Sequence, residues 1–525
     1  MKTKLLMLMA LCALLASCGN NEKNQKTDAA APVLTAVSPE PGATGVLVST
    51  SSVVFSYDQN IKISLADQSR ISITPEVAIN SVNAYNNTIT VSISGLEYAT
   101  TYTVEVPEGA VNGFKSSQKA AAAARTSFTT ENAPVDPGTD ERLSDVAWDL
   151  AAALGLGWNM GNHMDAFNGT TPSETVWGNA KCTQATFTKL KQAGFKSVRI
   201  PVTWLDKIGP APGYKIDEAW LDRVAEIVGY AETAGLYAIV NTHHDECNND
   251  GHWLNILAAS VNPDTNESIK AEIKAVWTQI ADRFKDKGEW LILESFNEIQ
   301  DGGWGNSAAF RANPSVQCNV LNQWNQAFVD AVRATGGNNA TRWLGVPTYA
   351  ANPGFVDYFV MPSDPAGKMM LAFHCYDPYD FTIGDAQYSD WGHTGKAGNK
   401  ANGSDEEYFK ALFNKFTRNY VNKGIPVYIG EFGCSMRNKS DSRSWAFYKY
   451  YLEYVVKAAK TYGLPAFLWD NGAPGYGKER HGYINHGTGD YMGDSKEVVD
   501  IMTNAMNNAS PAYTLETVYA KAPKN

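Results

Sequence analysis

Two glutamates in similar sequence surroundings are the side chains best suited to do chemistry. Glu298 ends the run ESFNE at 294–298, and Glu431 lies in the run IGEFG at 429–433. Each follows an apolar stretch typical of a β-strand. A carboxylic acid that faces a carboxylate at about 5 to 5.5 Å cleaves a glycosidic bond by double displacement. Strand ends on opposite sides of a parallel barrel hold carboxylates at that separation, because all the strands end at one face.

The elements that would position these glutamates follow a regular order beyond residue 140. Apolar strands alternate with amphipathic helices, which implies parallel pairing and predicts a (β/α)8 barrel over residues 142–525. The expected strands are 156–160, 197–201, 237–242, 290–296, 342–346, 369–374, 427–431 and 466–469. The expected helices are 183–193, 218–234, 269–285, 318–334, 352–359, 406–421 and 442–462.

Polar and ionisable residues gather where the expected strands end. A single charged residue at one strand end is best interpreted as part of a structural ion pair. Reactive residue types at seven of the eight strand ends are hard to assign to packing alone. We therefore expect one reaction site at the carboxyl face of the barrel. The residues at these ends are Asn162, Arg199, His243, His244, Asn297, Glu298, His374, Tyr376, Glu431 and Trp469.

Several motifs in this region resemble glycoside hydrolase family 5, and in particular its subfamily 4 of endo-β-1,4-glucanases and xyloglucanases. They are GWNMGN at 157–162, ETVWGN at 174–179, VRIPVTW at 198–204 and WDNG at 469–472, and the likeness covers essentially all of 142–525. One departure is His163-Met164, where the family commonly has Thr-Leu, and it concerns the shape of the glycone-side subsites.

The resemblance implies that Glu298 is the acid/base and Glu431 the nucleophile. A general acid needs a raised pKa, and we expect Arg199 to lower the pKa of Glu431 by its positive charge. The resemblance further implies that Tyr376 donates to the nucleophile and that Asn297 binds the sugar 2-hydroxyl. The other residues expected to bind substrate are Arg199, His243, His244, His374, Trp469, Asn162, Trp177, Trp304 and Trp391.

Some of these residues have a structural alternative. A lone histidine near a strand end is usually a core residue, and Trp177, Trp304 and Trp391 are as compatible with loop packing as with sugar stacking. The run HHDEC at 243–247 contains metal-binding residue types, but neighbouring strand residues point to opposite faces and no HExxH motif occurs. We expect no metal and no cofactor.

The first part of the chain has a different composition. Residues 32–131 are rich in Ser, Thr and Val with period-two alternation, and they resemble bacterial Ig-like β-sandwich modules. The absence of clustered carboxylates favours a spacer over a carbohydrate-binding module. Residues 132–141, with APVDPG at 133–138, predict a linker.

The N-terminus has the features of an export signal. Lys2 and Lys4 precede an apolar stretch over 5–15 that is too short to span a bilayer, and LASC at 15–18 resembles a bacterial lipobox. This predicts a signal peptide over 1–17, acylation of Cys18, a tether over 18–31 and an outer-membrane lipoprotein facing the cell surface or the periplasm. A plain secretory signal with an incidental cysteine is the alternative.

Composition narrows the partners. A net charge of −11 without a basic stripe argues against binding to nucleic acid. Cys182, Cys247, Cys318, Cys375 and Cys434 lack zinc spacing or a disulfide framework and are interpreted as small buried residues.

These observations predict a monomeric, retaining endo-β-1,4-glucanase that acts on cellulose-type chains, mixed-linkage β-glucan or xyloglucan. The alternatives are the same mechanism on mannan or xylan, a surface protein that binds glycan without cleaving it, and adhesion through the Ig-like part.

Overall fold

The computed structural model describes residues 30–48, 50–114, 119–131, 142–246, 252–384, 388–401 and 403–524. The chain divides into two compact units, Met1–Asn132 and Ala133–Asn525. The predicted signal peptide, Cys18, most of the tether, the linker and Cys247 lie outside the described residues. Each unit has its own hydrophobic core and is described by itself.

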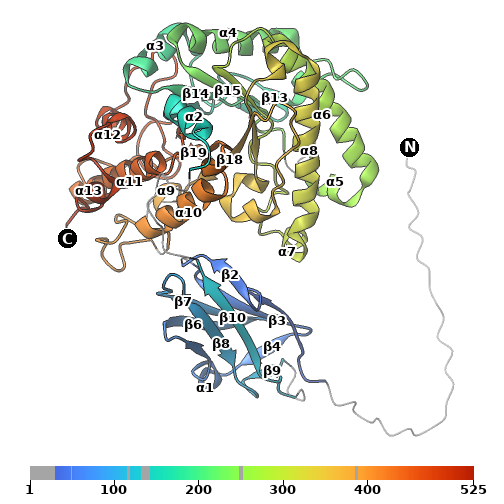
Figure 1. The fold of residues 1–525 in the computed structure, drawn as a ribbon, viewed down its shortest axis with the longest axis vertical. Helices are drawn as coiled ribbons and strands as arrows, with labels where there is room; N and C mark the ends of the chain where they lie inside the picture. Colours follow the sequence, from blue (N-terminus) through green and yellow to red (C-terminus); the bar gives the residue numbers. More distant parts are fainter. Residues whose placement is uncertain are drawn as a thin grey trace, which may run out of the picture. The chain divides into compact units, whose positions relative to one another are not determined.

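The first unit is a β-sandwich, as predicted (Figure 1). One sheet contains, in order, β1 (Leu34–Ser38), β3 (Ser52–Tyr57), β7 (Thr88–Ser94) and β6 (Ala78–Tyr85). The other contains β2 (Ala43–Val46), β10 (Ala124–Thr130), β8 (Thr101–Val106) and β5 (Ser72–Thr74). Alternate side chains of β7 and β8 point inward and are buried, and this alternation is the pattern that the sequence showed. A short helix, α1 (Leu65–Gln68), and the pair β4 (Ile61–Ile63) and β9 (Val111–Gly113) complete the unit as described.

The second unit is a closed barrel of eight parallel strands, which confirms the predicted fold class. Each expected strand is present, with boundaries that differ by a few residues at most. The strands are β11 (Leu156–Met160), β14 (Ser197–Ile200), β15 (Tyr237–Val240), β16 (Leu291–Glu294), β17 (Leu344–Pro347), β18 (Met369–Cys375), β19 (Val427–Phe432) and β20 (Ala466–Asp470).

Helices surround the strands (Figure 1). The principal ones are α3 (Gln184–Gln192), α4 (Glu218–Ala234), α6 (Pro263–Phe284), α8 (Pro314–Ala334), α10 (Glu406–Asn419), α11 (Ser442–Thr461) and α12 (Ser495–Asn507). Shorter helices are α2 (Val146–Leu154), α5 (Ile256–Val261), α7 (Ala308–Ala312), α9 (Tyr379–Thr382) and α13 (Leu515–Tyr519).

Three helices differ from the prediction for physical reasons. Helices α6 and α8 begin several residues earlier than expected, because Asn262 and Asn313 cap them and a proline occupies the first turn of each. The helix expected near 352–359 is a short 3₁₀ helix, η5 (Pro353–Tyr358), which leaves the fifth barrel strand without a long helix after it.

The barrel interior changes from apolar to polar along its axis. Leu150 and Leu154 of α2 pack with inward side chains of the strands, among them Ile239, Ile292 and Phe467. This cluster closes the amino-terminal end. One inward position further along β15 and β16 lie Asn241 and Glu294, so the polar layer begins where the apolar cluster ends.

A β-bulge in β19 determines which way Glu431 points. Phe373 of β18 pairs with Ile429, but His374 pairs with Glu431, so Gly430 is an extra residue in the strand. The pairing with β20 shifts at the same place. Tyr428 points into the barrel, and strict alternation from there would turn Glu431 outward. The bulge therefore turns Glu431 toward the interior.

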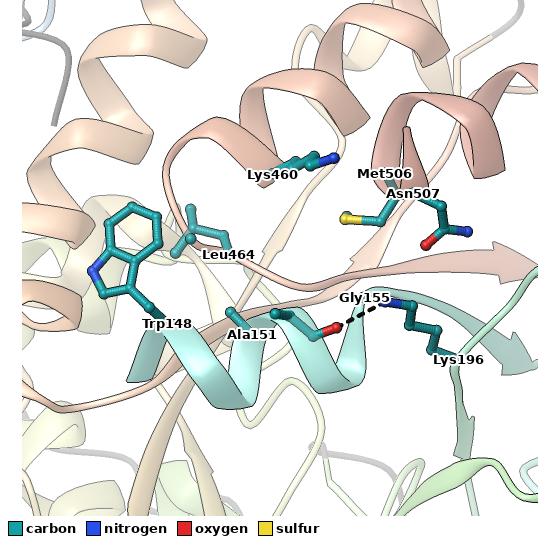
Figure 2. Close-up of a pocket in the computed structure, with 10 residues that line it drawn as sticks. Trp148, Ala151, Gly155, Lys196, Lys460, Leu464, Met506 and Asn507 are labelled. Atoms are coloured by element: carbon teal, nitrogen blue, oxygen red, sulfur yellow. Dashed lines mark hydrogen bonds between the residues drawn. The ribbon is translucent and has the colours of Figure 1, made fainter. Parts of the chain in front are cut away.

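A pocket of about 270 Å³ lies at the amino-terminal end of the barrel, beside Trp148, Gly155 and Leu464 (Figure 2). Its two lysines already donate to main-chain carbonyls, Lys196 to Ala152 and Lys460 to Asn508. These contacts join the start of β14 to α2 and the end of α11 to the segment after α12. The pocket and the predicted site are at opposite ends of the strands. In barrels of this kind the amino-terminal end serves stability, and reactions take place at the carboxyl end.

Candidate functional site

The carboxyl ends of the barrel strands bring the two predicted glutamates together. One carboxylate oxygen of Glu298, one of Glu431 and one ring nitrogen of His374 lie within 4.8 Å of one another. Glu298 follows β16, whereas Glu431 and His374 belong to the adjacent strands β19 and β18. The pair therefore has the separation of an acid and a nucleophile that act on one bond.

Glu298 is poised to hold a proton. Its Oε1 lies 2.7 Å from His374 Nδ1, and 16 % of its side chain is exposed. Burial raises the pKa of Glu298 to about 8, and the neighbouring carboxylate of Glu246 adds to this effect. Burial lowers the pKa of His374 to about 4, so this histidine stays neutral beside the acid.

Glu431 is held in a different way. Its Oε1 accepts a hydrogen bond from Arg199 Nη1 at 2.9 Å and its Oε2 accepts one from Tyr376 Oη at 2.9 Å. Arg199 lowers the pKa of Glu431, as expected, but burial outweighs this effect and the pKa is raised overall. Burial causes the rise, while the charge of Arg199 and the hydrogen bond from Tyr376 act against it. The ionised form of Glu431 is thus favoured relative to that of Glu298 by a guanidinium and a hydroxyl.

Arg199 connects most of the site and is fully buried. Its Nη2 donates to Asn297 Oδ1 at 2.8 Å, and its Nη1 also donates to Asn159 Oδ1 at 3.1 Å. Its Nε donates to Glu294 Oε2 at 2.7 Å. Burial disfavours the charge of Arg199, but Glu294 and Glu431 more than offset this and raise its pKa.

The prediction missed Asn159 and Glu294. The signal that would have found Glu294 is a charged residue at an inward position of an otherwise apolar strand, two residues after Ile292. Asn159 is likewise a buried polar residue in an apolar strand, β11, and its Nδ2 donates to the Gly430 carbonyl of the bulge at 2.8 Å.

Aromatic rings lie beside the glutamate pair. The rings of His243 and Trp469 are parallel, with an angle of 4° and a centroid distance of 5.8 Å, and His243 Nε2 is 3.9 Å from Glu431. His244 is at the same strand end and contacts the rings of Phe167 and Trp177. Trp177 is 40 % exposed.

His244 carries a charge. Burial disfavours its charged form, but Glu246, Asp165 and Glu431 outweigh this effect and raise the pKa of His244 to about 9. Among the described residues, Glu246 Oε2 has no hydrogen-bond partner although it is buried. The rings of Phe167 and Trp177 therefore lie beside a charged histidine, His244, which is in turn close to the carboxylate of Glu246.

Asn162 and His163 differ in their position. Asn162 is half-buried with φ 54°, and its N–H donates to Asp165 Oδ2 at 3.0 Å. His163 is fully buried, and its Nε2 accepts the Cys182 N–H at 3.1 Å. The departure from the family at His163-Met164 accordingly falls on two buried side chains.

The tryptophans Trp304 and Trp391 have opposite environments. Trp304 is 53 % exposed on a turn after β16, where it has φ 52° and its N–H donates to Gln300 Oε1. Trp391 is 1 % exposed and packs against Phe409, Tyr450, Tyr451 and Tyr454. The prediction that Trp391 stacks on sugar is therefore wrong, since its ring is buried against residues of helices α10 and α11.

Metal-binding residue types come together at three places in the described residues, and several of their donor atoms already have protein partners. Glu174 of the group His163, Glu174 and Cys182 is held by both ends of the Arg223 guanidinium. Asp165 of the group Asp165, His243 and His244 accepts the backbone N–H groups of Asn162 and His163. The third group is the pair of glutamates with His374.

Four cysteines of the described residues, Cys182, Cys318, Cys375 and Cys434, are free and buried, which confirms their interpretation as small core residues.

Comparison with known proteins assigns both units. Residues 160–475 match the family described as Cellulase (glycosyl hydrolase family 5), and residues 28–130 match a bacterial Ig-like domain. Endoglucanase A of Paenibacillus barcinonensis is 37 % identical over 356 residues, which are 64 % of this chain and 84 % of that protein.

Two solved structures extend this likeness. A GH5-4 broad specificity endoglucanase from Bacteroides salanitronis is 49 % identical with a TM-score of 0.67, covering 70 % of this chain and 97 % of that one. A family 5 xyloglucanase from Paenibacillus pabuli is 35 % identical with a TM-score of 0.63, covering 68 % and 100 %.

Proposed function

Because the chain belongs to glycosyl hydrolase family 5, we propose that it hydrolyses internal β-1,4-glucosidic bonds of soluble β-glucans with retention of configuration. The observation that carries the mechanism is the approach of the Glu298 and Glu431 carboxylates to within 4.8 Å. Retaining enzymes have carboxyl groups about 5 to 5.5 Å apart, whereas inverting enzymes need about 6.5 to 9.5 Å to admit a water.

The reaction takes two displacements. A Glu431 oxygen forms a bond to the anomeric carbon while the glycosidic C–O bond breaks, and the leaving oxygen takes the proton of Glu298. The product is a neutral glycosyl ester on Glu431 and an ionised Glu298. Glu298 then removes a proton from water, whose oxygen attacks the anomeric carbon and releases Glu431 as a carboxylate.

Neighbouring side chains support both steps. Asn297 Oδ1 accepts a hydrogen bond from Arg199, so the Asn297 Nδ2 group is available to donate to the sugar 2-hydroxyl. That contact strengthens in the transition state. Tyr376 and Arg199 fix the two oxygens of Glu431, so attack starts from one orientation.

The rings around the pair support an open binding site for several sugars. We assign the ring of Trp469 to the sugar being cleaved, Phe167, Trp177 and charged His244 to one side of it, and Trp304 to the other. The Bacteroides salanitronis and Paenibacillus pabuli proteins are described as a broad specificity endoglucanase and a xyloglucanase. We infer that this chain accepts carboxymethyl cellulose, mixed-linkage β-glucan and xyloglucan.

Product analysis tests the proposal. Early NMR spectra of cleaved cello-oligosaccharides should show the β-anomer first, and the viscosity of a polymer should fall faster than reducing ends appear. Initial appearance of the α-anomer would overturn the mechanism. A higher kcat/KM on mannan or xylan than on every β-glucan would keep the mechanism and reject the substrate.

We also propose that the chain is a monomer, exported and acylated at Cys18, with the Ig-like unit as a spacer between a membrane anchor and the barrel. The apolar stretch 5–15 and the LASC run at 15–18 support this. None of the described helices is both long and apolar enough to cross a bilayer.

A further inference from the structure

Glu294 is a buried carboxylate behind the reacting pair. It ends β16 and has 0 % exposure. It accepts three hydrogen bonds, from Arg199 Nε at 2.7 Å, Asn241 Nδ2 at 2.9 Å and Tyr428 Oη at 2.7 Å. An ionised carboxylate only accepts, and these three donors suit that form. A buried charge of this kind is retained only when it is well paired.

The neighbouring strand β17 leaves space for the Tyr428 hydroxyl that donates to Glu294. Gly345 of β17 pairs with Glu294 in the sheet. A Cβ atom on Gly345 would lie 2.3 Å from the Tyr428 hydroxyl, so a side chain there would displace the tyrosine from Glu294. The contact with Tyr428 thus depends on a glycine on the neighbouring strand.

Glu294 sets the direction of the Arg199 fork. The guanidinium is planar and its donors have fixed relative directions. Once Nε is bound to Glu294, Nη1 points to Glu431 and Nη2 points to Asn297. Without the Nε contact, Arg199 could turn about its long side chain, and both groups that the reaction uses would lose their common anchor.

Glu294 also balances the charge of Arg199. Arg199 has two carboxylate partners, Glu294 and Glu431. When Glu431 becomes an ester in the proposed mechanism, it loses its charge, and Arg199 keeps only Glu294 as a close counter-ion. We infer that Glu294 is a positioning residue that orients Arg199 and neutralises it while Glu431 is esterified, an inference that depends on the proposed function.

Removal of the Glu294 charge should affect the two displacements in opposite directions. In Glu294→Gln the full charge of Arg199 acts on Glu431. This attraction stabilises the carboxylate, so nucleophilic attack slows and release of the carboxylate from the ester speeds up. If the substitution only loosened the packing around Arg199, both displacements would become slower.

The test uses a 2-deoxy-2-fluoro-β-cellobioside with a good leaving group, which forms a long-lived ester on the nucleophile. In Glu294→Gln we expect trapping to slow by about 10-fold, the factor that corresponds to stabilisation of the Glu431 carboxylate by about one pKa unit. Reactivation of the trapped enzyme should be faster than in the wild type. The acidic limb of kcat/KM, which reports Glu431, should move to lower pH.

The other groups that face Glu431 are unchanged in this variant. They are Arg199, Tyr376, His243, His244, His374 and Glu298. Glu406→Gln is the matched control, because Glu406 is also buried in the second unit and accepts from Tyr450 and His393, but it begins α10. It should leave trapping, reactivation and the acidic limb as they are.

Glu294→Asp separates orientation from charge and covers the case in which Glu294→Gln does not fold. It should slow trapping while the acidic limb stays at the wild-type pH. A folded Glu294→Gln that traps, reactivates and titrates like the wild type would overturn the inference. If the wild type is not labelled on Glu431, the proposed function fails instead.

Discussion

The side chains Glu298 and Glu431 have the same chemistry but different contacts. Glu298 contacts a neutral histidine, whereas Glu431 contacts a guanidinium and a phenol. When Glu298 holds the proton of the pair, its charge no longer opposes ionisation of Glu431, so the pair has one favoured arrangement at neutral pH. These contacts explain a division of roles that the two residue types alone do not give.

Alanine at either glutamate should lower kcat on polysaccharide by several orders of magnitude, because each removal leaves a step for which water is a poor substitute. Azide distinguishes the roles. With Glu298→Ala, azide should attack the ester and give a β-glycosyl azide. With Glu431→Ala, it should take the place of the nucleophile and give an α-glycosyl azide. Reversed anomers in the NMR spectra would show that the roles are exchanged.

The raised pKa of Glu298 predicts the basic limb of the pH profile. Its acid form is present below a pKa of about 8 and is lost above it, so kcat/KM should fall as the pH rises through about 8. The measurement uses an aryl β-cellobioside with a poor leaving group, which needs the acid. Glu298→Ala assayed with an activated aryl group should lack this limb, and its persistence would assign the limb to another residue.

The β19 bulge is the element that aims the nucleophile. Its extra residue, Gly430, has no space for a side chain, since a Cβ atom would lie 2.9 Å from His374 Nε2. His374 in turn contacts Glu298. A residue at the bulge thus affects the acid and the nucleophile together.

Gly430→Ala should therefore lower kcat by up to about 100-fold, because His374 must move and shift the contact with Glu298. KM should change less, since the aromatic rings are not touched. Gly229→Ala is the control: Gly229 is within α4 with nothing within 4 Å of its Cβ position, and alanine there should stabilise the helix by about 1 kcal/mol. Wild-type kcat in Gly430→Ala would contradict the assigned role of the bulge.

The strands and most helices were predictable because each has its own periodicity in the sequence. Arg199, His374 and Glu431 were found because polar residues at strand ends stand out against apolar runs. The bulge was not predictable, since it is a property of the pairing between β18 and β19. Trp391 was misjudged because its burial depends on rings of α11, more than 50 residues further along the chain.

At the scale of the whole chain, the predicted anchor is separate from the chemistry. Cys18→Ala should move activity from the membrane fraction to the soluble fraction of the host, because the acyl chains provide the attachment. Specific activity should not change, as no residue assigned to the reaction is near Cys18 in the sequence. Fractionation with an activity assay checks this. A wild-type enzyme that is fully soluble in its host would contradict the lipobox.

The two units have separate cores, and this predicts the effect of removing the first. The sandwich core includes Phe55, Val91 and Phe128, and the barrel core draws on its own strands and helices. All the residues assigned to substrate lie at 162 or beyond, and a unit of this size usually folds alone. A chain of residues 142–525 should therefore keep its kcat/KM on soluble β-glucan and unfold in one cooperative thermal transition.

The control is the full chain without residues 1–17. If the shorter chain lost affinity for soluble oligosaccharides, measured as a raised KM with unchanged kcat, the Ig-like unit would contribute to binding and would not be a spacer.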